Sequence, residues 1–393
     1  MVIHAGGRTG PYQWVRFLGE GSSAEVWAAW REGRLIAVKV FQGGARRSPF
    51  VEAIRREMRI GELIRGVPGA VSVERVHEHG GHLFLEMEYV RGPSLDQVLT
   101  GQLTVAHRPI PVRCAVGWAI EILRTLDAVA HRVAPRRPRS FLHRDLKPGN
   151  LLLRPATGQV CVTDFGVARA EAELGFEATA TGVVKGSPRF MAPEAILEQP
   201  MDARSDQYSV GVVLYELITG RPLFQGPDLA HVLLAVAEGF DEAALEHVPG
   251  PPELRMVLRT LLTREVAGRY PSTADAALAL ADLELQGEGV GDVLRSLVTC
   301  AMTRDGARLF DEAMRPLGEV LSDDEDTMLA HADDEDTLVS EGSLGSEITW
   351  EPTEVTDVLP DVQPEPDDET EVVDHGALLE ALEQHRKNRG DDS

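Results

Sequence analysis

The sequence predicts an α+β protein with a small β-rich lobe, a larger helical lobe and a disordered acidic tail. Up to residue 90, short runs of β-type residues are separated by glycine-containing turns, and after Pro93 longer helical patterns replace them. The charge is distributed unevenly: residues 285–393 carry 30 Asp and Glu against 7 Lys and Arg, whereas residues 1–284 carry 33 against 32. A nearly neutral globular part is therefore followed by a segment of different character.

The β-rich lobe is predicted from five apolar runs, and one helix interrupts them. That helix covers residues 49–64, where Ile54, Met58 and Ile60 fall near one face and three arginines near the other. The helical lobe is predicted from five longer segments. The strands are expected at residues 14–18, 25–30, 35–41, 71–77 and 82–89, and the helices at 112–131, 205–219, 229–238, 252–263 and 273–285.

The last part of the chain divides in two. Residues 286–321 are predicted to form a helical extension, and residues 322–393 an acidic disordered tail, because like charges repel and few large apolar residues are available to bury. The block DDEDT occurs at residues 323–327 and again at 333–337, which places Thr327 and Thr337 in matched acidic frames. Three roles stay open for this tail: an inert solubilising extension, a docking or phosphoacceptor segment, and an autoinhibitor that occupies a basic surface such as the arginine-rich residues 134–139.

Composition excludes several classes of protein. The three cysteines, Cys114, Cys161 and Cys300, lie far apart and show no disulfide or zinc spacing, which favours a reducing compartment. No signal-peptide pattern opens the sequence, and no stretch of about 18 apolar residues could span a membrane. The strong acidity argues against nucleic-acid binding. A cytoplasmic protein with no membrane span is expected.

Two motifs in the β-rich lobe indicate phosphate binding. In the segment LGEGSSAEV, residues 18–26, glycines allow backbone N–H groups to approach phosphate oxygens, although an ordinary hairpin turn explains this segment alone equally well. Thirteen residues after Val26, Lys39 lies in an apolar strand, where it must reach solvent or meet a fixed anion. The spacing between the two motifs favours the anion.

The strongest pattern lies further along the chain. His143 begins the segment HRDLKPGN, Asp164 begins DFG, and Ala192 begins APE. In this order and spacing the sequence resembles the protein kinase family over about residues 12–285. The resemblance implies the two-lobed protein kinase fold, with an N-lobe at 12–90, a C-lobe at 91–285 and an extension at 1–11.

The resemblance also assigns roles in phosphoryl transfer. Lys39 is expected to contact the α- and β-phosphates of ATP and to pair with Glu57, 18 residues later on the predicted helix. Asp145 is expected to accept the proton of the substrate hydroxyl, and Lys147 to neutralise charge on the transferred group. Asn150 and Asp164 are expected to hold Mg²⁺.

The adenine site follows from the same resemblance. Residues 88–90 resemble the hinge between the lobes, where the backbones of Glu88 and Val90 would bind the adenine edge, and Met87 takes the gatekeeper position. Each apolar residue taken singly is also explained by an ordinary core. The expected ATP-binding set is Leu18, Gly19, Gly21, Val26, Ala37, Lys39, Glu88, Val90 and Leu152.

The catalytic loop indicates which hydroxyl the protein phosphorylates. A lysine two residues after the catalytic aspartate, here Lys147 after Asp145, resembles the loop of serine/threonine kinases. Asp206 and Gly211 match the start of a structural helix, and Arg269 matches the arginine that forms a buried ion pair with Glu194 in this family. The catalytic loop and the compact helical lobe look bacterial, and the missing membrane span separates the chain from receptor-like members.

Arg144, before Asp145, resembles the RD class, which a phosphate on the activation loop often switches on. Thr179 or Thr181 is therefore the expected autophosphorylation site. The predicted function is ATP- and Mg²⁺-dependent phosphorylation of Ser or Thr in protein substrates, with a tail-binding protein as a further partner. The alternative is a pseudokinase-like scaffold that binds partners through its tail, but Lys39 and the three other key polar residues are all present.

Overall fold

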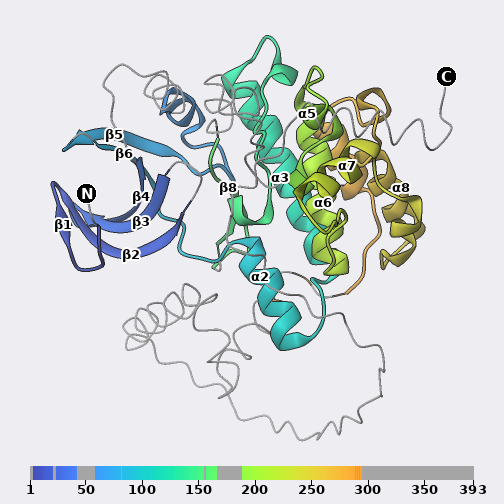
Figure 1. Ribbon diagram of the computed structural model, residues 1–393, viewed down its shortest axis with the longest axis horizontal. Coiled ribbons are helices and arrows are strands. Elements are labelled where there is room, and N and C mark those ends of the chain that lie inside the picture. The colour runs from blue at the N-terminus through green and yellow to red at the C-terminus, as the bar shows by residue number, and fades with distance from the viewer. Residues whose placement is uncertain are drawn as a thin grey trace, which may run out of the picture.

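A computed structural model describes residues 3–20, 24–41, 58–80, 82–154, 156–165 and 188–287, together with residues 289, 291 and 293. Figure 1 shows a curled sheet at one end of the molecule and a group of helices at the other, with β8 between them. This arrangement confirms the predicted α+β fold with a β-rich lobe followed by a helical lobe.

The β-rich lobe is an antiparallel sheet with the strand order β1-β2-β3-β4-β6-β5. Its five longer strands lie where β-type runs predict them, and β1 is a two-residue addition at the edge. The strands are β1 (Arg8–Thr9), β2 (Tyr12–Glu20), β3 (Ala24–Arg31), β4 (Arg34–Phe41), β5 (Val73–His79) and β6 (His82–Glu88).

Strand β4 is buried on both of its faces, and this determines where its lysine points. Val38 and Val40 belong to an aromatic-rich cluster on one face of the sheet. Ala37 and Phe41 belong to a second cluster on the opposite face. Because side chains alternate along a strand, Lys39 shares the face of Ala37 and Phe41. It is only 6% exposed, so the sheet directs this cation into the protein.

The helical lobe is built around two long buried helices, α3 and α6. Almost every residue of α6 is buried, and Asp202 caps its first turn by accepting a hydrogen bond from the Arg204 backbone N–H. Gly211 in α6 allows close packing, since a Cβ there would lie 3.0 Å from the Leu261 side chain. The helices are α2 (Leu95–Gly101), α3 (Val112–Val133), α5 (Pro193–Ile196), α6 (Ala203–Thr219), α7 (Leu229–Glu238), α8 (Pro252–Leu261) and α9 (Thr273–Ala281).

A short hairpin of β7 (Leu151–Leu153) and β8 (Val160–Val162) connects the two lobes. The Val71 N–H donates to the Val162 carbonyl at 2.9 Å, and the Val162 N–H donates to the Gly69 carbonyl at 2.7 Å. The predicted catalytic loop leads into β7 and Asp164 follows β8, so this hairpin fixes the spacing of the polar residues between the lobes.

Some elements differ from the sequence-based expectation. The predicted helix at 273–285 ends earlier, because the Leu283 N–H bonds to the Leu280 carbonyl and tightens the last turn. Helix α2 and the β7–β8 hairpin were not predicted. Of the helix expected at 49–64, residues 58–64 are described and helical. The remainder lies outside the described residues, as do the predicted tail and nearly all of the predicted helical extension.

Candidate active site

The predicted catalytic loop forms a compact polar group around Asp145. The Asn150 side-chain amide donates to the Asp145 carbonyl and to its Oδ2, both at 2.8 Å. Lys147 Nζ lies 3.5 Å from the same Oδ2. Three residues that the sequence predicts to act together are therefore in mutual contact, and the carboxylate of Asp145 is held from two sides.

The backbone before Asp145 is fixed by a buried carboxylate. Asp206, in the first turn of α6, accepts from the His143 N–H at 2.7 Å and from the Arg144 N–H at 3.0 Å. Arg144 has a φ of 72°, a left-handed conformation that a non-glycine residue adopts at some energetic cost. Burial raises the pKa of Asp206, against the lowering effect of His143. This residue, which the family resemblance treats as structural, thus shapes the loop.

A second polar pair lies across from the loop. Lys39 Nζ contacts Asp164 Oδ1 at 3.0 Å. Burial alone would raise the pKa of Asp164, but Lys39, His143 and Lys147 together outweigh burial and hold that pKa below its usual value. The carboxylate is therefore ionised at neutral pH. Its φ of 63° is again left-handed.

His143 links the two polar groups. One of its ring nitrogens, Nε2, lies 2.7 Å from the carbonyl oxygen of Thr163, the residue before Asp164. The Thr163 N–H donates to the Asn150 carbonyl at 3.1 Å. The ring also packs edge-on against Phe165, with the ring centroids 4.9 Å apart. These contacts hold the catalytic loop and the segment after β8 as one unit.

The oxygen atoms at this site fit a hard cation. Asn150 donates through its nitrogen, which leaves its side-chain oxygen as an acceptor, and Asp164 is ionised. Within the described residues no three His, Cys, Asp or Glu side chains gather as a metal site. Mg²⁺ suits such a place, since it commonly takes one or two protein oxygens and completes its shell with water and phosphate.

The predicted adenine pocket is lined by one apolar cluster. Ala37, Met87 and Val90 are buried members of it, and Val26 and Leu152 pack against them. Leu18 is 37% exposed and lies outside this cluster. Gly19 pairs with Val26 across β2 and β3. The structure therefore brings most of the predicted adenine-binding residues together on the face of the sheet that also carries Lys39.

The hinge is held by two arginines that sequence reasoning missed. Arg154, just after β7, forms an ion pair with Glu88 and donates from Nε to the Cys161 sulfur at 3.1 Å. From the sheet, Arg16 donates to the Tyr89 hydroxyl at 2.5 Å. No motif marks either arginine, so the sequence holds no signal for these contacts.

Several predicted site residues lie outside the described part of the chain. Glu57 and Gly21 are among them, together with both activation-loop threonines, Thr179 and Thr181. The expected pairing of Lys39 with Glu57 therefore stays a prediction, and the described partner of Lys39 is Asp164.

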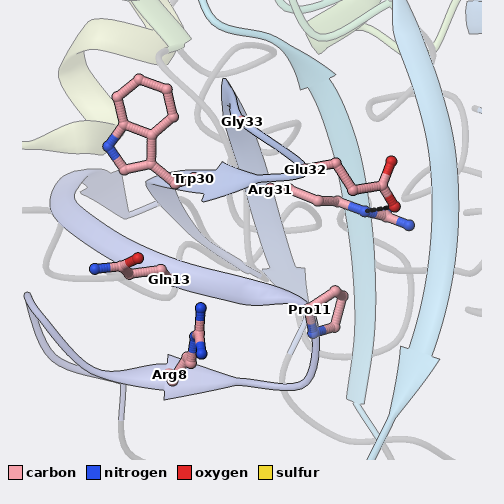
Figure 2. Close-up of a pocket in the computed structure, with 7 residues that line it drawn as sticks. All are labelled: Arg8, Pro11, Gln13, Trp30, Arg31, Glu32 and Gly33. Carbon is pink, nitrogen blue, oxygen red and sulfur yellow. Dashed lines mark ion pairs between the residues drawn. The ribbon is translucent and has the colours of Figure 1, made fainter.

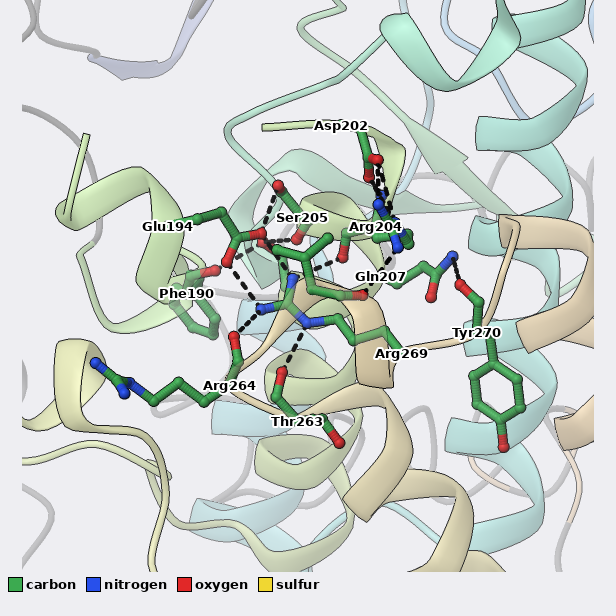
Figure 3. A network of polar contacts seen from close by, with 12 residues as sticks. Phe190, Glu194, Asp202, Arg204, Ser205, Gln207, Thr263, Arg264, Arg269 and Tyr270 are labelled. Carbon is green, nitrogen blue, oxygen red and sulfur yellow. Dashed lines mark hydrogen bonds and ion pairs between the residues drawn. The ribbon is translucent and has the colours of Figure 1, made fainter. Parts of the chain in front are cut away.

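A buried polar network lies in the helical lobe (Figure 3). Arg269 binds Glu194 through two parallel contacts of 2.7 and 2.8 Å, which confirms the predicted ion pair. Its guanidinium also donates to the carbonyls of Thr263, Arg204 and Arg264 at 2.8 to 3.1 Å. This network joins the segment after the activation loop to the start of α6 and the approach to α9.

A separate surface hollow of about 410 Å³ lies at the far edge of the sheet (Figure 2). None of the predicted active-site residues lines it. Its wall consists of Arg8, Pro11, Gln13, Trp30, Arg31, Glu32 and Gly33.

Comparison with known proteins gives the following matches. The chain matches the protein kinase domain over residues 12–276. The serine/threonine-protein kinase PknA of Mycobacterium tuberculosis is 34% identical over 292 residues, covering 70% of this chain and 61% of PknA. The tyrosine-protein kinase MasK of Myxococcus xanthus is 35% identical over 294 residues, covering 71% of this chain and 44% of MasK.

A third relative, the probable serine/threonine-protein kinase SCO3848 of Streptomyces coelicolor, is 33% identical over 295 residues. The match covers 72% of this chain and 41% of that relative. The chain thus spans between 41% and 61% of the length of these curated relatives. Among solved structures, a double mutant of the Mycobacterium tuberculosis PknI kinase domain aligns with a TM-score of 0.51 at 24% identity, covering 72% of this chain and 99% of that one.

No helix in the described residues is both long and apolar enough to span a membrane.

Proposed function

This chain belongs to the protein kinase family, and we propose that it is a serine/threonine kinase that phosphorylates proteins, itself included, from ATP with Mg²⁺. One observation carries the proposal: Asp145 is held by Asn150 at 2.8 Å and flanked by Lys147 at 3.5 Å, within one unit that also contains Asp164. Phosphoryl transfer needs a positioned proton acceptor beside compensating positive charge, and this group supplies both.

In the proposed reaction, Asp145 orients the hydroxyl of the acceptor residue and takes its proton as the oxygen attacks the γ-phosphorus. Asn150 holds the carboxylate in place from one side. Lys147, on the other side, stabilises the negative charge that spreads over the transferred group. The bond between the γ-phosphorus and the β-phosphate oxygen breaks as the new ester bond forms, and ADP leaves with the electron pair of the broken bond.

Lys39 and Asp164 position the nucleotide in this proposal. Lys39 is directed inward by β4 and would meet the α- and β-phosphates, while Asp164 and the Asn150 side-chain oxygen would hold Mg²⁺. The metal supplies charge neutralisation between the phosphates. The adenine ring would lie between Ala37 and Leu152, against the hinge that Arg154 and Arg16 hold.

Specificity for Ser and Thr rests on Lys147, because a lysine two residues after the catalytic aspartate is the serine/threonine form. The matched relatives include proteins named for both specificities, so the nature of the acceptor is part of the proposal. We place the protein in the cytoplasm, since the buried Cys114 and Cys161 are free thiols. Proteins with Ser or Thr acceptors are its proposed substrates, and the acidic tail is a segment to which a partner protein could bind.

The test is phosphate transfer from labelled ATP and Mg²⁺ to the full-length chain and to a generic basic protein. Asp145→Asn is the inactive variant, and Asp282→Asn, an exposed aspartate in the same lobe, is the matched control. We expect label on Ser and Thr with wild type and control, and a loss of about 10²-fold or more with Asp145→Asn. Label on Tyr alone would overturn the specificity, and ATP binding without any transfer would favour a scaffold.

A further inference from the structure

Four arginines gather on the surface where α3 ends. Arg132 lies in the last turn of α3, and Arg136, Arg137 and Arg139 follow it on the connection to the catalytic loop. All four are exposed. We propose that this arginine cluster is the docking site for the acidic segment of the same chain, residues 316–385. The proposal is independent of the phosphoryl-transfer activity.

The cluster is presented on a preformed backbone. The Arg137 N–H donates to the Ala134 carbonyl, and the Ser140 N–H and hydroxyl donate to the Arg137 carbonyl, all at 2.8 to 2.9 Å. The 3₁₀ turn Pro138–Ser140 follows directly. Proline at the start of this turn restricts the backbone further. A ligand therefore does not have to order the loop before it can bind.

Within the described residues, no ion pair neutralises the charges of the cluster. None of the four guanidinium groups forms an ion pair or hydrogen bond with another described residue. The neighbouring carboxylates are already engaged. Burial would raise the pKa of Asp202, but hydrogen bonds and charge from Arg204, with a smaller influence from Arg139, lower it, and Arg204 binds the carboxylate at 2.7 Å. Asp127 lies 3.3 Å from His131. The cluster is thus a concentrated positive patch on an otherwise balanced lobe.

The acidic segment is the ligand of matching chemistry. Residues 316–385 contain 23 Asp and Glu and neither Lys nor Arg. Guanidinium groups bind carboxylates through paired N–H donors, which a lysine patch could not do as well. Each exposed pair is weak by itself, so docking requires several pairs at once. Runs such as residues 323–326 and 333–336 offer four adjacent carboxylates each.

The segment can reach the cluster within one molecule. Arg113, near the start of α3, donates to the Gly287 carbonyl at 3.4 Å, so the chain passes the opposite end of that helix there. Val293 is still buried in the core of the helical lobe. The 22 residues of α3 span about 33 Å. The 22 residues between Val293 and Pro316 can cover up to about 75 Å. Tethering also gives the segment an effective concentration of roughly millimolar, which favours it over a free acidic partner.

The experiment places a photo-crosslinking amino acid, benzoylphenylalanine, at the exposed position of Pro135 in the full-length chain. After irradiation, mass spectrometry identifies the linked peptide, and gel mobility separates links within one chain from links between two. We expect intrachain links to residues 316–385 in about 0.1 M salt. The yield should fall by roughly fivefold or more in about 1 M salt, where the Debye length shrinks from about 10 Å to about 3 Å.

The variant Arg136→Gln/Arg137→Gln/Arg139→Gln should reduce the yield equally. Its matched control, Arg8→Gln/Arg75→Gln/Arg221→Gln, removes three exposed arginines elsewhere and should leave the yield unchanged. Circular dichroism verifies that both variants stay folded. Equal yields from both variants, links only to other parts of the chain, or links only between two chains would each overturn the proposal. The last outcome would assign the cluster to a second copy of the chain.

Discussion

Lys39 Nζ lies 3.0 Å from Asp164 Oδ1, although 125 positions separate the two residues in the sequence. This ion pair joins the central strand of the sheet to the segment that follows the hairpin between the lobes. Lys39 has little access to solvent, so the carboxylate of Asp164 compensates its charge, and Lys39 is the largest of the cationic influences on Asp164. The pair is therefore structural as well as a candidate contact for nucleotide and metal.

Lys39→Met is expected to lower kcat/KM for phosphate transfer by about 10²-fold or more, because a positive charge near the phosphates is lost. It should also destabilise the protein by about 1 to 3 kcal/mol, since the half-buried carboxylate of Asp164 loses its hydrogen-bonded cation. Urea unfolding measures the second effect. The double variant Lys39→Met/Asp164→Asn should recover part of the stability but none of the activity, and a purely additive result would contradict the coupling.

The ionisation of Asp164 predicts a pH dependence of stability. Its pKa in the folded protein is held below the ordinary value of about 4, so the charged form contributes stability above that value. The contribution is lost as pH falls toward the lower, folded-state pKa. Wild type should thus lose stability relative to Asp164→Asn as pH decreases below about 4. The measurement is the unfolding free energy of both proteins as a function of pH. If the two curves run parallel below a pH of about 4, the lowered pKa of Asp164 is refuted.

Arg154 predicts an effect on ATP binding rather than on chemistry. Arg154→Met removes the side chain that holds Glu88 at the hinge, so the adenine-binding backbone loses one restraint. We expect KM for ATP to rise roughly threefold to tenfold with little change in kcat, as for the loss of about 1 kcal/mol of positioning. Steady-state kinetics at varied ATP measures both constants. Arg221→Met, an exposed change in the other lobe, should alter neither, and a fall in kcat alone for Arg154→Met would count against this role.

The Arg269 network predicts a large loss of stability. Arg269→Met leaves the carboxylate of Glu194 buried without its partner. It also removes the hydrogen-bond donors of three backbone carbonyls. Unfolding in urea should show a loss of about 3 to 5 kcal/mol with an unchanged m-value. The double variant Arg269→Met/Glu194→Gln should lose less, because it removes the unpaired charge. Equal losses in both variants would show that the carbonyl bonds, and not the charge, dominate.

Sequence reasoning reached the parts of the site that are contiguous. Asp145, Lys147 and Asn150 lie within one short segment, and their mutual contacts follow from a tight loop between buried elements. The inward direction of Lys39 was favoured by its spacing from the glycine-containing segment at residues 18–26. Regular patterns of apolar residues likewise predicted the longer strands and helices, and the structure confirms them.

The missed features depend on pairs that are distant in the sequence. Arg154 and Glu88 are 66 positions apart, and although Glu88 lies in the predicted hinge, no motif marks Arg154. Strands β7 and β8 have three residues each, too few for alternation to be visible. Gly61 lets its helix pack closely against Val73 in β5, because glycine has no side chain at the contact. A pattern of apolar side chains cannot reveal a contact of this kind.

That contact gives a final prediction, because two helical glycines in this protein should respond oppositely to alanine. A Cβ at Gly61 would lie 2.3 Å from the Val73 Cβ, whereas a Cβ at Gly117, inside α3, would meet nothing within 4 Å. Alanine favours a helix over glycine by about 1 kcal/mol. Gly117→Ala should therefore stabilise the protein by up to about that amount.

Gly61→Ala should instead destabilise the protein by about 1 to 3 kcal/mol, because overpacking against Val73 exceeds the gain in helix propensity. Thermal unfolding and urea unfolding measure both variants. Adding Val73→Ala to Gly61→Ala should cost less than the two single changes added together, since the second change makes room for the new methyl group. If Gly61→Ala stabilises the protein as Gly117→Ala does, the helix and β5 do not approach as closely as the structure places them.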